Sequence, residues 1–171
     1  MVMTVNDSNT PDKTAITAEA VYSILAAVKD PEIPVISIQD LGILQRVELH
    51  GKTVCVGIIP TYSGCPAMHA IKTDIKAALL PWVTQHVIEN VEVELLDKPV
   101  WTTNMISAKG RAAMQAYGIA PPLSAEEKQI KCPQCGSIDT RCISEFGSTA
   151  CKALYRCNSC LEPFDYFKCH A

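Results

Sequence analysis

Seven of the nine cysteines of this 171-residue chain fall between residues 131 and 171, and four of them form two CxxC pairs. Cys132 and Cys135 are separated from Cys157 and Cys160 by 21 residues. Each pair can present two thiolates to one tetrahedral ion while the chain between the pairs forms strands. A segment this short buries too little apolar surface to fold by itself, whereas a structural zinc ion contributes on the order of 10 kcal/mol to folding. The spacing therefore predicts a four-cysteine zinc ribbon over residues 131–171.

The cysteine spacing does not choose the metal, because thiolates also suit rubredoxin-like iron and iron-sulfur clusters. A small reduced or disulfide-linked domain without metal is the other interpretation. Cys142, Cys151 and Cys169 remain outside the two pairs. Small buried or half-buried side chains are favoured over a second site at these positions. The terminal pair Cys169-His170 is the feature most able to change that interpretation.

A lone cysteine, Cys65, lies between a glycine and a proline where a predicted strand gives way to a predicted helix. The partial positive charge and free N–H groups of a helix N-terminus favour a thiolate and lower its pKa. His69 follows one helical turn later, Thr61 lies in the same turn as the cysteine, and Asp40 lies in a proline-rich loop. From these residues three interpretations stay open: a soft-metal site with an incomplete ligand set, a nucleophile with an adjacent base, and a buried cysteine.

The elements that must position Cys65 follow in the order helix, strand, strand, helix, strand over residues 17–97. Thr17 can cap a first helix, which must end by Asp30 because Pro31 follows. Two alternating runs around the turn HGK, residues 50–52, predict a hairpin, with Cys55 of the second run in the core. The fold class is therefore α+β, with a small α-β-β-α-β domain followed by the zinc ribbon.

The second helix and third strand of this domain are bounded by prolines and by alternation. Pro66 suits the first helical position, and Pro81 is expected to end that helix. The alternating run Val87–Leu95 predicts the third strand. A further helix is expected over residues 107–117. The division expected for the whole chain is a flexible tail over residues 1–16, an assembly domain over 17–117, a linker over 118–130 and the ribbon over 131–171.

Charge and hydropathy narrow the function classes. The formal net charge is −3, and no stretch has the length of a signal peptide core or a membrane span. We therefore expect a cytoplasmic protein with mostly reduced cysteines. Five basic and four acidic residues in the ribbon segment, together with a divalent ion bound by four thiolates, give that segment a charge of about −1. This balance favours a protein partner over nucleic acid.

Five stretches of the sequence carry two family resemblances. DPEIPVISIQDLGIL, residues 30–44, followed by TYSGCPAMHAI, resembles the iron-sulfur assembly domains related to SufT, whose pattern combines DPE, a proline, DLG and a T-x-x-GCP loop. The downstream stretches PVWTTNMIS, GRAAMQAYGIAPP and EFGSTACKALYRCNSCLEPFDYFKC resemble the PaaD branch, which accompanies the phenylacetyl-CoA 1,2-epoxidase of aerobic phenylacetate breakdown. Together the two resemblances cover nearly the whole chain.

The resemblance implies an accessory factor for maturation of a metal centre in a multicomponent monooxygenase, with no catalytic activity of its own. Its implied partners are the di-iron oxygenase subunits, the iron-sulfur flavin reductase, or both, and a homodimer would pair two thiols. By this resemblance, Cys65 corresponds to the reactive cysteine of the family, which is expected to hold iron or an iron-sulfur cluster transiently. Asp40 and Thr61 correspond to neighbouring loop residues of the family site, and His69 is a further candidate ligand. A stoichiometric structural subunit and a Cys65-dependent thiol enzyme are the alternatives.

One departure from the branch falls at Asn104-Met105, where an acidic residue and a tryptophan are expected. The sequence therefore gives less support to a partner contact through that segment.

Overall fold

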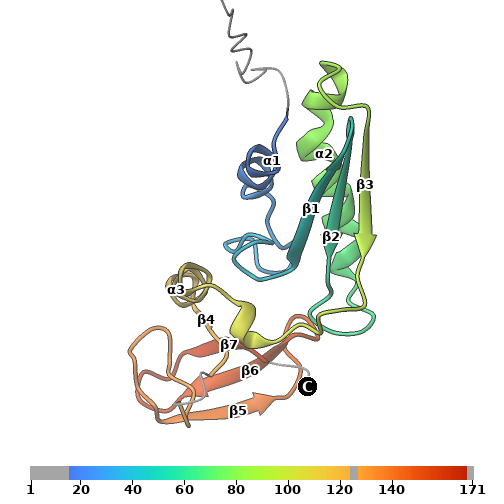
Figure 1. Ribbon diagram of the computed structural model, residues 1–171. Coiled ribbons are helices and arrows are strands. Elements are labelled where there is room, and N and C mark those ends of the chain that lie inside the picture. The colour runs from blue at the N-terminus through green and yellow to red at the C-terminus, as the bar shows by residue number, and fades with distance from the viewer. Residues whose placement is uncertain (1–15, 124–126, 169–171) are drawn as a thin grey trace, which may run out of the picture.

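The computed structural model describes residues 16–123 and 127–168, which form two β-sheets with three α-helices around them. Figure 1 shows the first sheet with α1 and α2 beside it, and the second sheet beyond α3. Nearly all of the expected N-terminal tail lies outside the described residues, as does the Cys169-His170 pair. The predicted fold class, an α+β domain followed by a four-cysteine module, is confirmed.

The first sheet is built by residues 44–95 in the predicted order. The strands β1 (Leu44–His50) and β2 (Thr53–Ile58) pair in antiparallel fashion around the expected turn, and β3 (Asn90–Leu95) lies parallel to β2. The helix α2 (Ala67–Thr84) makes the crossover that two parallel neighbouring strands require. The shorter helix α1 (Ala18–Leu25) contacts both α2 and β1.

The start of α1 agrees with the prediction from the local sequence, whereas the end of α2 does not. Thr17 caps α1 as predicted, since its hydroxyl accepts the N–H of Ala20 at 3.2 Å. Pro81, by contrast, does not end α2, which continues to Thr84. A proline removes one backbone hydrogen bond, but Trp82 and Val83 beyond it pack against the core. Tertiary packing thus outweighs the local signal at this position.

The C-terminal part of the chain forms a second sheet with the strand order β4-β7-β6-β5. A short 3₁₀ helix, η1 (Thr103–Met105), leads into α3 (Ala108–Tyr117), which is capped by Ser107. The strands are β4 (Ile119–Ala120), β5 (Thr140–Ser144), β6 (Lys152–Cys157) and β7 (Pro163–Phe167). The strand β4 lies in the segment expected to be a linker, and it pairs in parallel with β7 of the second sheet.

One hydrophobic core spans both sheets. Phe167 of β7 and Cys151 just before β6 belong to the same cluster as Ile71 of α2 and Val54 of β2. The ring of Phe167 meets that of Trp101 edge to face at a centroid separation of 6.0 Å. The second sheet is thus fixed against the first by side-chain packing as well as by the connecting chain.

Two glycines allow segments of this fold to approach closely. A Cβ atom on Gly110 of α3 would lie 2.8 Å from Cδ1 of Ile36 and 2.9 Å from the carbonyl oxygen of Asp40. A Cβ on Gly42, which has a φ of +77°, would lie 2.6 Å from Cβ of Met105. The loop after α1 is therefore held tightly between η1 and α3.

The expectation that Cys55 lies in the core is wrong. Its side chain is only partly buried and lies on the open face of the first sheet, where its sulfur is 3.9 Å from a carboxylate oxygen of Glu92. In a half-covered sheet alternate residues face solvent, and Val54 and Val56 occupy the covered face instead. None of the helices in the described ranges has the length and apolarity needed to cross a bilayer.

Candidate functional site

The two CxxC pairs meet in space as a four-thiol cluster. The sulfurs of Cys132, Cys135, Cys157 and Cys160 all lie within 4.8 Å of one another, and no other group of three or more His, Cys, Asp or Glu side chains among the described residues meets this criterion. The Cys132–Cys160 and Cys135–Cys157 sulfur separations are 3.7 and 3.5 Å. A tetrahedral zinc ion with Zn–S bonds of about 2.3 Å requires sulfur separations of about 3.8 Å. The cluster therefore fits a structural zinc ion.

Backbone N–H groups favour the thiolate form of one of these sulfurs, which is the form that binds a metal. The N–H of Cys160 points at Cys157 Sγ across 3.5 Å. This interaction is the main cause of the lowered pKa of Cys157, about 6. Cys132 and Cys157 are buried, whereas Cys135 is exposed and Cys160 is partly exposed. Four thiolates that enclose one ion leave no ligand position for a substrate, which is typical of a structural site.

Cys65 occupies a different kind of environment at the start of α2. It lies just before Pro66, the N-cap residue, and is half-buried. The N–H of Ala67 and the hydroxyl of Tyr62 both donate hydrogen bonds to its sulfur. The N–H of Cys65 in turn donates to the carbonyl of Tyr62 at 3.2 Å, which closes the turn. The thiol is thus held by local contacts at a helix N-terminus, as its sequence position predicts.

The protonation of Cys65 differs from the sequence-based expectation of a lowered pKa. Burial raises the pKa of this thiol above its usual value of 9.0, and the nearby charges of Glu32 and Asp30 raise it further. The hydrogen bonds from Ala67 and Tyr62 act in the opposite direction but do not prevail. At neutral pH the thiol is therefore protonated, and a cation must displace its proton in order to bind.

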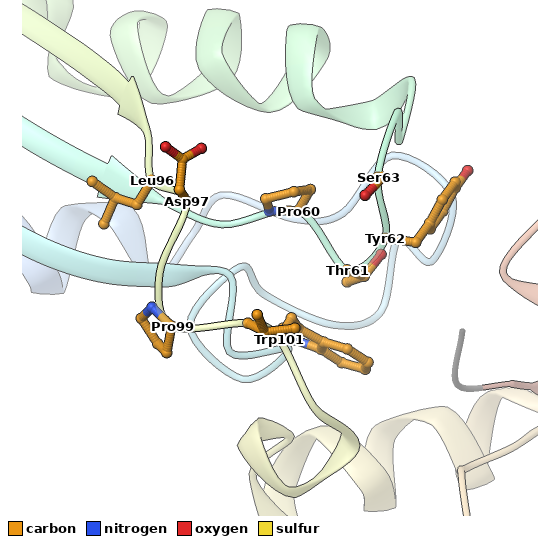
Figure 2. A pocket seen from close by; sticks show the side chains of 9 residues that line it. Pro60, Thr61, Tyr62, Ser63, Leu96, Asp97, Pro99 and Trp101 are labelled. Carbon is orange, nitrogen blue, oxygen red and sulfur yellow. The ribbon is translucent and has the colours of Figure 1, made fainter. Parts of the chain in front are cut away.

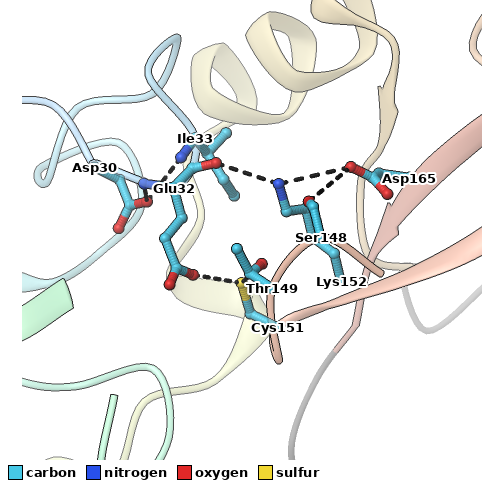
Figure 3. Close-up of polar contacts among 8 residues, drawn as sticks. All are labelled: Asp30, Glu32, Ile33, Ser148, Thr149, Cys151, Lys152 and Asp165. Carbon is cyan, nitrogen blue, oxygen red and sulfur yellow. Dashed lines mark hydrogen bonds and ion pairs between the residues drawn. The ribbon is translucent and has the colours of Figure 1, made fainter. Parts of the chain in front are cut away.

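The acidic groups beside Cys65 come from the DPE loop. The buried carboxylate of Asp30 accepts the N–H groups of Glu32 and Ile33, both at 2.9 Å, so Asp30 shapes the loop. The side chain of Glu32 is left to reach across to the second sheet, where Cys151 Sγ lies 3.1 Å from its Oε2 atom (Figure 3). Sequence reasoning noted Glu32 only as part of a motif and treated Cys151 as a small buried residue.

The carboxylate of Asp40 is held by its own loop and by the start of α3. Its carboxylate accepts hydrogen bonds from the hydroxyls of Ser37 at 2.8 Å and Ser107 at 2.7 Å, and Lys109 lies 3.5 Å away. Partial burial opposes ionisation, but these three partners hold the pKa of Asp40 below its usual value of 3.8. The geometry assigns Asp40 to the anchoring of α3 on the loop after α1.

Thr61 and His69 differ in their exposure to solvent. Thr61 is buried, and it lines a cavity of about 450 Å³ together with Tyr62, Asp97, Trp101 and neighbouring residues (Figure 2). The labelled Tyr62 ring points away from the Leu96 and Asp97 side of this cavity. His69 is exposed on α2. Of the four candidates named from the sequence, Cys65 is the one that lies close enough to the carboxylates of Glu32 and Asp30 for their charges to raise its pKa.

Two family models match the chain and together span most of it. Residues 18–94 match the model described as iron-sulfur cluster assembly protein. Residues 120–168 match the model described as PaaD zinc beta ribbon domain. The second match begins at Ala120 of β4 and includes the four cysteines of the ribbon.

Curated relatives and a solved structure agree with these matches. The chain is 44% identical over 154 residues to an Escherichia coli (strain K12) protein named as a putative subunit of 1,2-phenylacetyl-CoA epoxidase, with 87% of this chain and 91% of the relative covered. It is 30% identical over 92 residues to a Porphyromonas gingivalis (strain ATCC BAA-308 / W83) protein named "Fe-S protein maturation auxiliary factor", with 53% of this chain and 84% of the relative covered. A DUF59 domain of Bacillus anthracis superposes with a TM-score of 0.51 at 26% identity, over 57% of this chain and 90% of that domain.

Proposed function

The chain belongs to the PaaD family of phenylacetyl-CoA 1,2-epoxidase proteins, and from that premise we propose that it acts as an accessory factor for maturation of a metal centre in such an epoxidase. The centre served is a di-iron site of the oxygenase or an iron-sulfur cluster of its reductase. Its partners are accordingly proteins of that system. The ribbon holds zinc permanently, and Cys65 holds iron or a cluster in transit.

The observation that carries this proposal is the contrast between the two thiol environments. The ribbon offers four sulfurs within 4.8 Å of one another, a complete set for one ion. Cys65 offers one half-buried sulfur beside Glu32 and Asp30, an incomplete set. An incomplete set binds more weakly and leaves positions through which a receiving protein can take the ion. We thus assign the permanent structural metal to the ribbon and the transiently held cargo to Cys65.

The same geometry gives little support to a thiol enzyme. A nucleophilic cysteine needs a lowered pKa or an adjacent base. Burial and neighbouring carboxylates instead raise the pKa of Cys65, and His69 is exposed on α2. A proton-bearing thiol can still bind a metal, because the cation itself displaces the proton.

A stoichiometric structural subunit of the epoxidase is the second candidate. It is favoured by the name of the E. coli relative, which calls that protein a subunit, and by apolar side chains exposed on the ribbon. Four of these are between 50% and 67% exposed, namely Ile138, Ile143, Phe146 and Leu161. Exposed apolar side chains of this size suit a protein partner.

The test is to purify the epoxidase from cells that carry Cys65→Ala in this protein and to measure iron and acid-labile sulfide per complex. Maturation predicts an iron-poor or sulfide-poor epoxidase, although the variant itself folds and retains its zinc. Cys142→Ala is the matched control, because Cys142 is exposed and lies outside both thiol sites. A fully loaded epoxidase that co-purifies with Cys65→Ala at fixed stoichiometry would instead establish the structural-subunit function.

A further inference from the structure

We infer that Cys151 and Glu32 complete the cargo site at Cys65, so that a divalent metal ion binds between the two sheets through two thiolates and one carboxylate. This inference deepens the proposed function and rests on it. It assigns a metal-ligand function to a cysteine that belongs to the ribbon segment but not to the zinc cluster.

The contact between Cys151 and Glu32 joins the two sheets. Cys151 is 4% exposed and lies just before β6, whereas Glu32 lies in the loop after α1. The Cys151 thiol donates to Glu32 Oε2 over 3.1 Å, and the Thr149 hydroxyl lies 3.0 Å from the same sulfur. A protonated thiol and a carboxylate in contact are two ligands for a borderline-soft cation, held together in advance.

Tyr62 connects this contact to Cys65. Its hydroxyl hydrogen bonds to the Cys65 thiol, and its ring packs against the core cluster that contains Cys151. Burial, followed by the charges of Cys65, Glu32 and Cys151, raises the pKa of Tyr62 to about 12. Tyr62 thus contacts Cys65 directly and lies close enough to Glu32 and Cys151 to respond to their charges, and Cys65 itself packs against the cluster that contains Cys151.

The surrounding charges suit a cation. Lys152 is 6% exposed, and its ammonium lies 3.3 Å from the carbonyl oxygen of Glu32 and 3.6 Å from Asp165 (Figure 3). The ammonium is paired with the Asp165 carboxylate, so that the carboxylates of Glu32 and Asp30 near Cys65 have no ion pair of their own with it. Lys152 also fixes the Glu32 backbone on β6, which leaves the Glu32 carboxylate free to meet Cys151.

The three proposed ligand atoms do not form a close group in the structure. Among the described residues only the ribbon thiols lie within 4.8 Å of one another as a group, so Cys65 must turn toward Glu32 and Cys151 when the ion binds. Both thiols carry protons beforehand, because burial raises the pKa of Cys65 and raises that of Cys151 to about 12. Binding of one divalent ion forms two metal–sulfur bonds and one metal–oxygen bond, and it releases two protons to solvent. No change of oxidation state is involved.

The test is an anaerobic titration of the full-length, zinc-loaded protein with Co²⁺, which reports thiolate ligation through its sulfur-to-metal charge-transfer absorption. Zinc already fills the ribbon, so the added cobalt reports the second site. We expect one cobalt per chain with charge transfer from two thiolates. Cys65→Ser and Cys151→Ser should each weaken cobalt binding by at least about tenfold and remove about half of the charge-transfer intensity. Glu32→Gln should weaken binding while it leaves the intensity unchanged.

A matched control is Cys142→Ser, which changes an exposed cysteine of the same module and should leave cobalt binding unaltered. Cobalt binding that is unchanged in Cys151→Ser would overturn the inference. If the substitutions impair folding, X-ray absorption of the cobalt-loaded wild-type protein decides the matter without them, because it counts the sulfur ligands of the added cobalt. We expect two sulfurs per cobalt ion, and a single sulfur ligand would again overturn the inference.

Failure of this inference is distinguishable from failure of the proposed function. An epoxidase that is iron-poor with Cys65→Ala but fully loaded with Cys151→Ser would support the maturation function and refute the two-thiol site. An epoxidase that is fully loaded with both variants, while the isolated protein binds cobalt through both thiols, would support the site and refute the maturation function.

Discussion

The thiol of Cys151 lies 3.1 Å from the carboxylate of Glu32, although the two residues are 119 positions apart in the chain. Cys151 belongs to the segment that builds the zinc ribbon, and Glu32 belongs to the loop that precedes the first sheet. The contact therefore ties the part of the protein that resembles iron-sulfur assembly proteins to the part that carries the structural metal. Substitutions in each part and at their junction should have separable effects.

Removal of the structural metal should unfold the second sheet. Cys132→Ser/Cys135→Ser is expected to lose its one zinc ion per chain, because only two of the four sulfurs remain. Structural zinc contributes on the order of 10 kcal/mol to the folding of such modules. The variant should therefore lose the near-ultraviolet circular dichroism of Tyr155 and Tyr166, which lie in the strands of this sheet. Cys142→Ser should retain both zinc and spectrum, and a zinc-free double variant with an unaltered spectrum would contradict the prediction.

Lys152→Met should destabilise the junction between the sheets. The substitution keeps the length of the side chain but leaves the Glu32 carbonyl and Asp165 without their buried cationic partner. Because Asp165 is partly exposed, we expect a loss of about 2 kcal/mol, below the loss for a fully buried pair. Urea unfolding measures it. Lys131→Met removes the exposed i,i+4 pair with Glu127 and should cost less than about 1 kcal/mol; equal effects of the two substitutions would refute the buried junction.

Gly110→Ala should destabilise the protein, although alanine is the better helix former. In an exposed helix the change would stabilise by about 1 kcal/mol. At this position the new Cβ would lie 2.8 Å from Ile36 and 2.9 Å from the Asp40 carbonyl, so overpacking should cost about 1–3 kcal/mol instead. The reverse change Ala112→Gly, at an exposed position of the same helix, is the control and should cost about 1 kcal/mol through propensity alone. Thermal unfolding of both variants would show whether the close approach exists.

Asp40 should make stability dependent on acidic pH. Its folded pKa lies below the usual 3.8, so its stabilising contribution is present above that value and is lost as the pH falls through the lower folded pKa. Asp40→Asn should be less stable than the wild type at pH 7, and the difference should shrink as the pH falls below 3.8. Guanidinium unfolding at several pH values measures the difference between the two proteins, which cancels the contribution of other carboxylates. A difference that grows with acidity would contradict the assignment.

The alkylation rate of Cys65 should still increase above pH 9. Burial and the charges of Glu32 and Asp30 raise the pKa of this thiol above 9.0, so the thiolate fraction at neutral pH is small. Glu32→Gln should increase the rate at neutral pH because it removes one of these charges. Iodoacetamide labelling followed by peptide mass spectrometry measures each cysteine separately. A rate that reaches its plateau below pH 8 would instead indicate an activated nucleophile.

The sequence by itself determined the elements and the metal ligands that depend on short-range patterns. The spacing of the two CxxC pairs predicted the four-thiol cluster, because each pair presents two sulfurs from one local turn. Alternation and capping predicted the order of helices and strands in the first sheet, with Thr17 at the start of α1. The Pro81 prediction failed because packing of the following residues, which local propensity does not contain, extends α2 by another turn.

The tertiary structure alone decided which residues lie around Cys65. Asp40 and His69 were the natural candidates in the sequence, yet Asp40 anchors α3 and His69 is exposed. Glu32 lies near the thiol because the DPE loop packs there, and Cys151 meets Glu32 because the second sheet shares a core with the first. Burial at that shared core, a property of the whole fold, also raises the pKa of Cys65, which the position of the residue at a helix N-terminus would by itself lower.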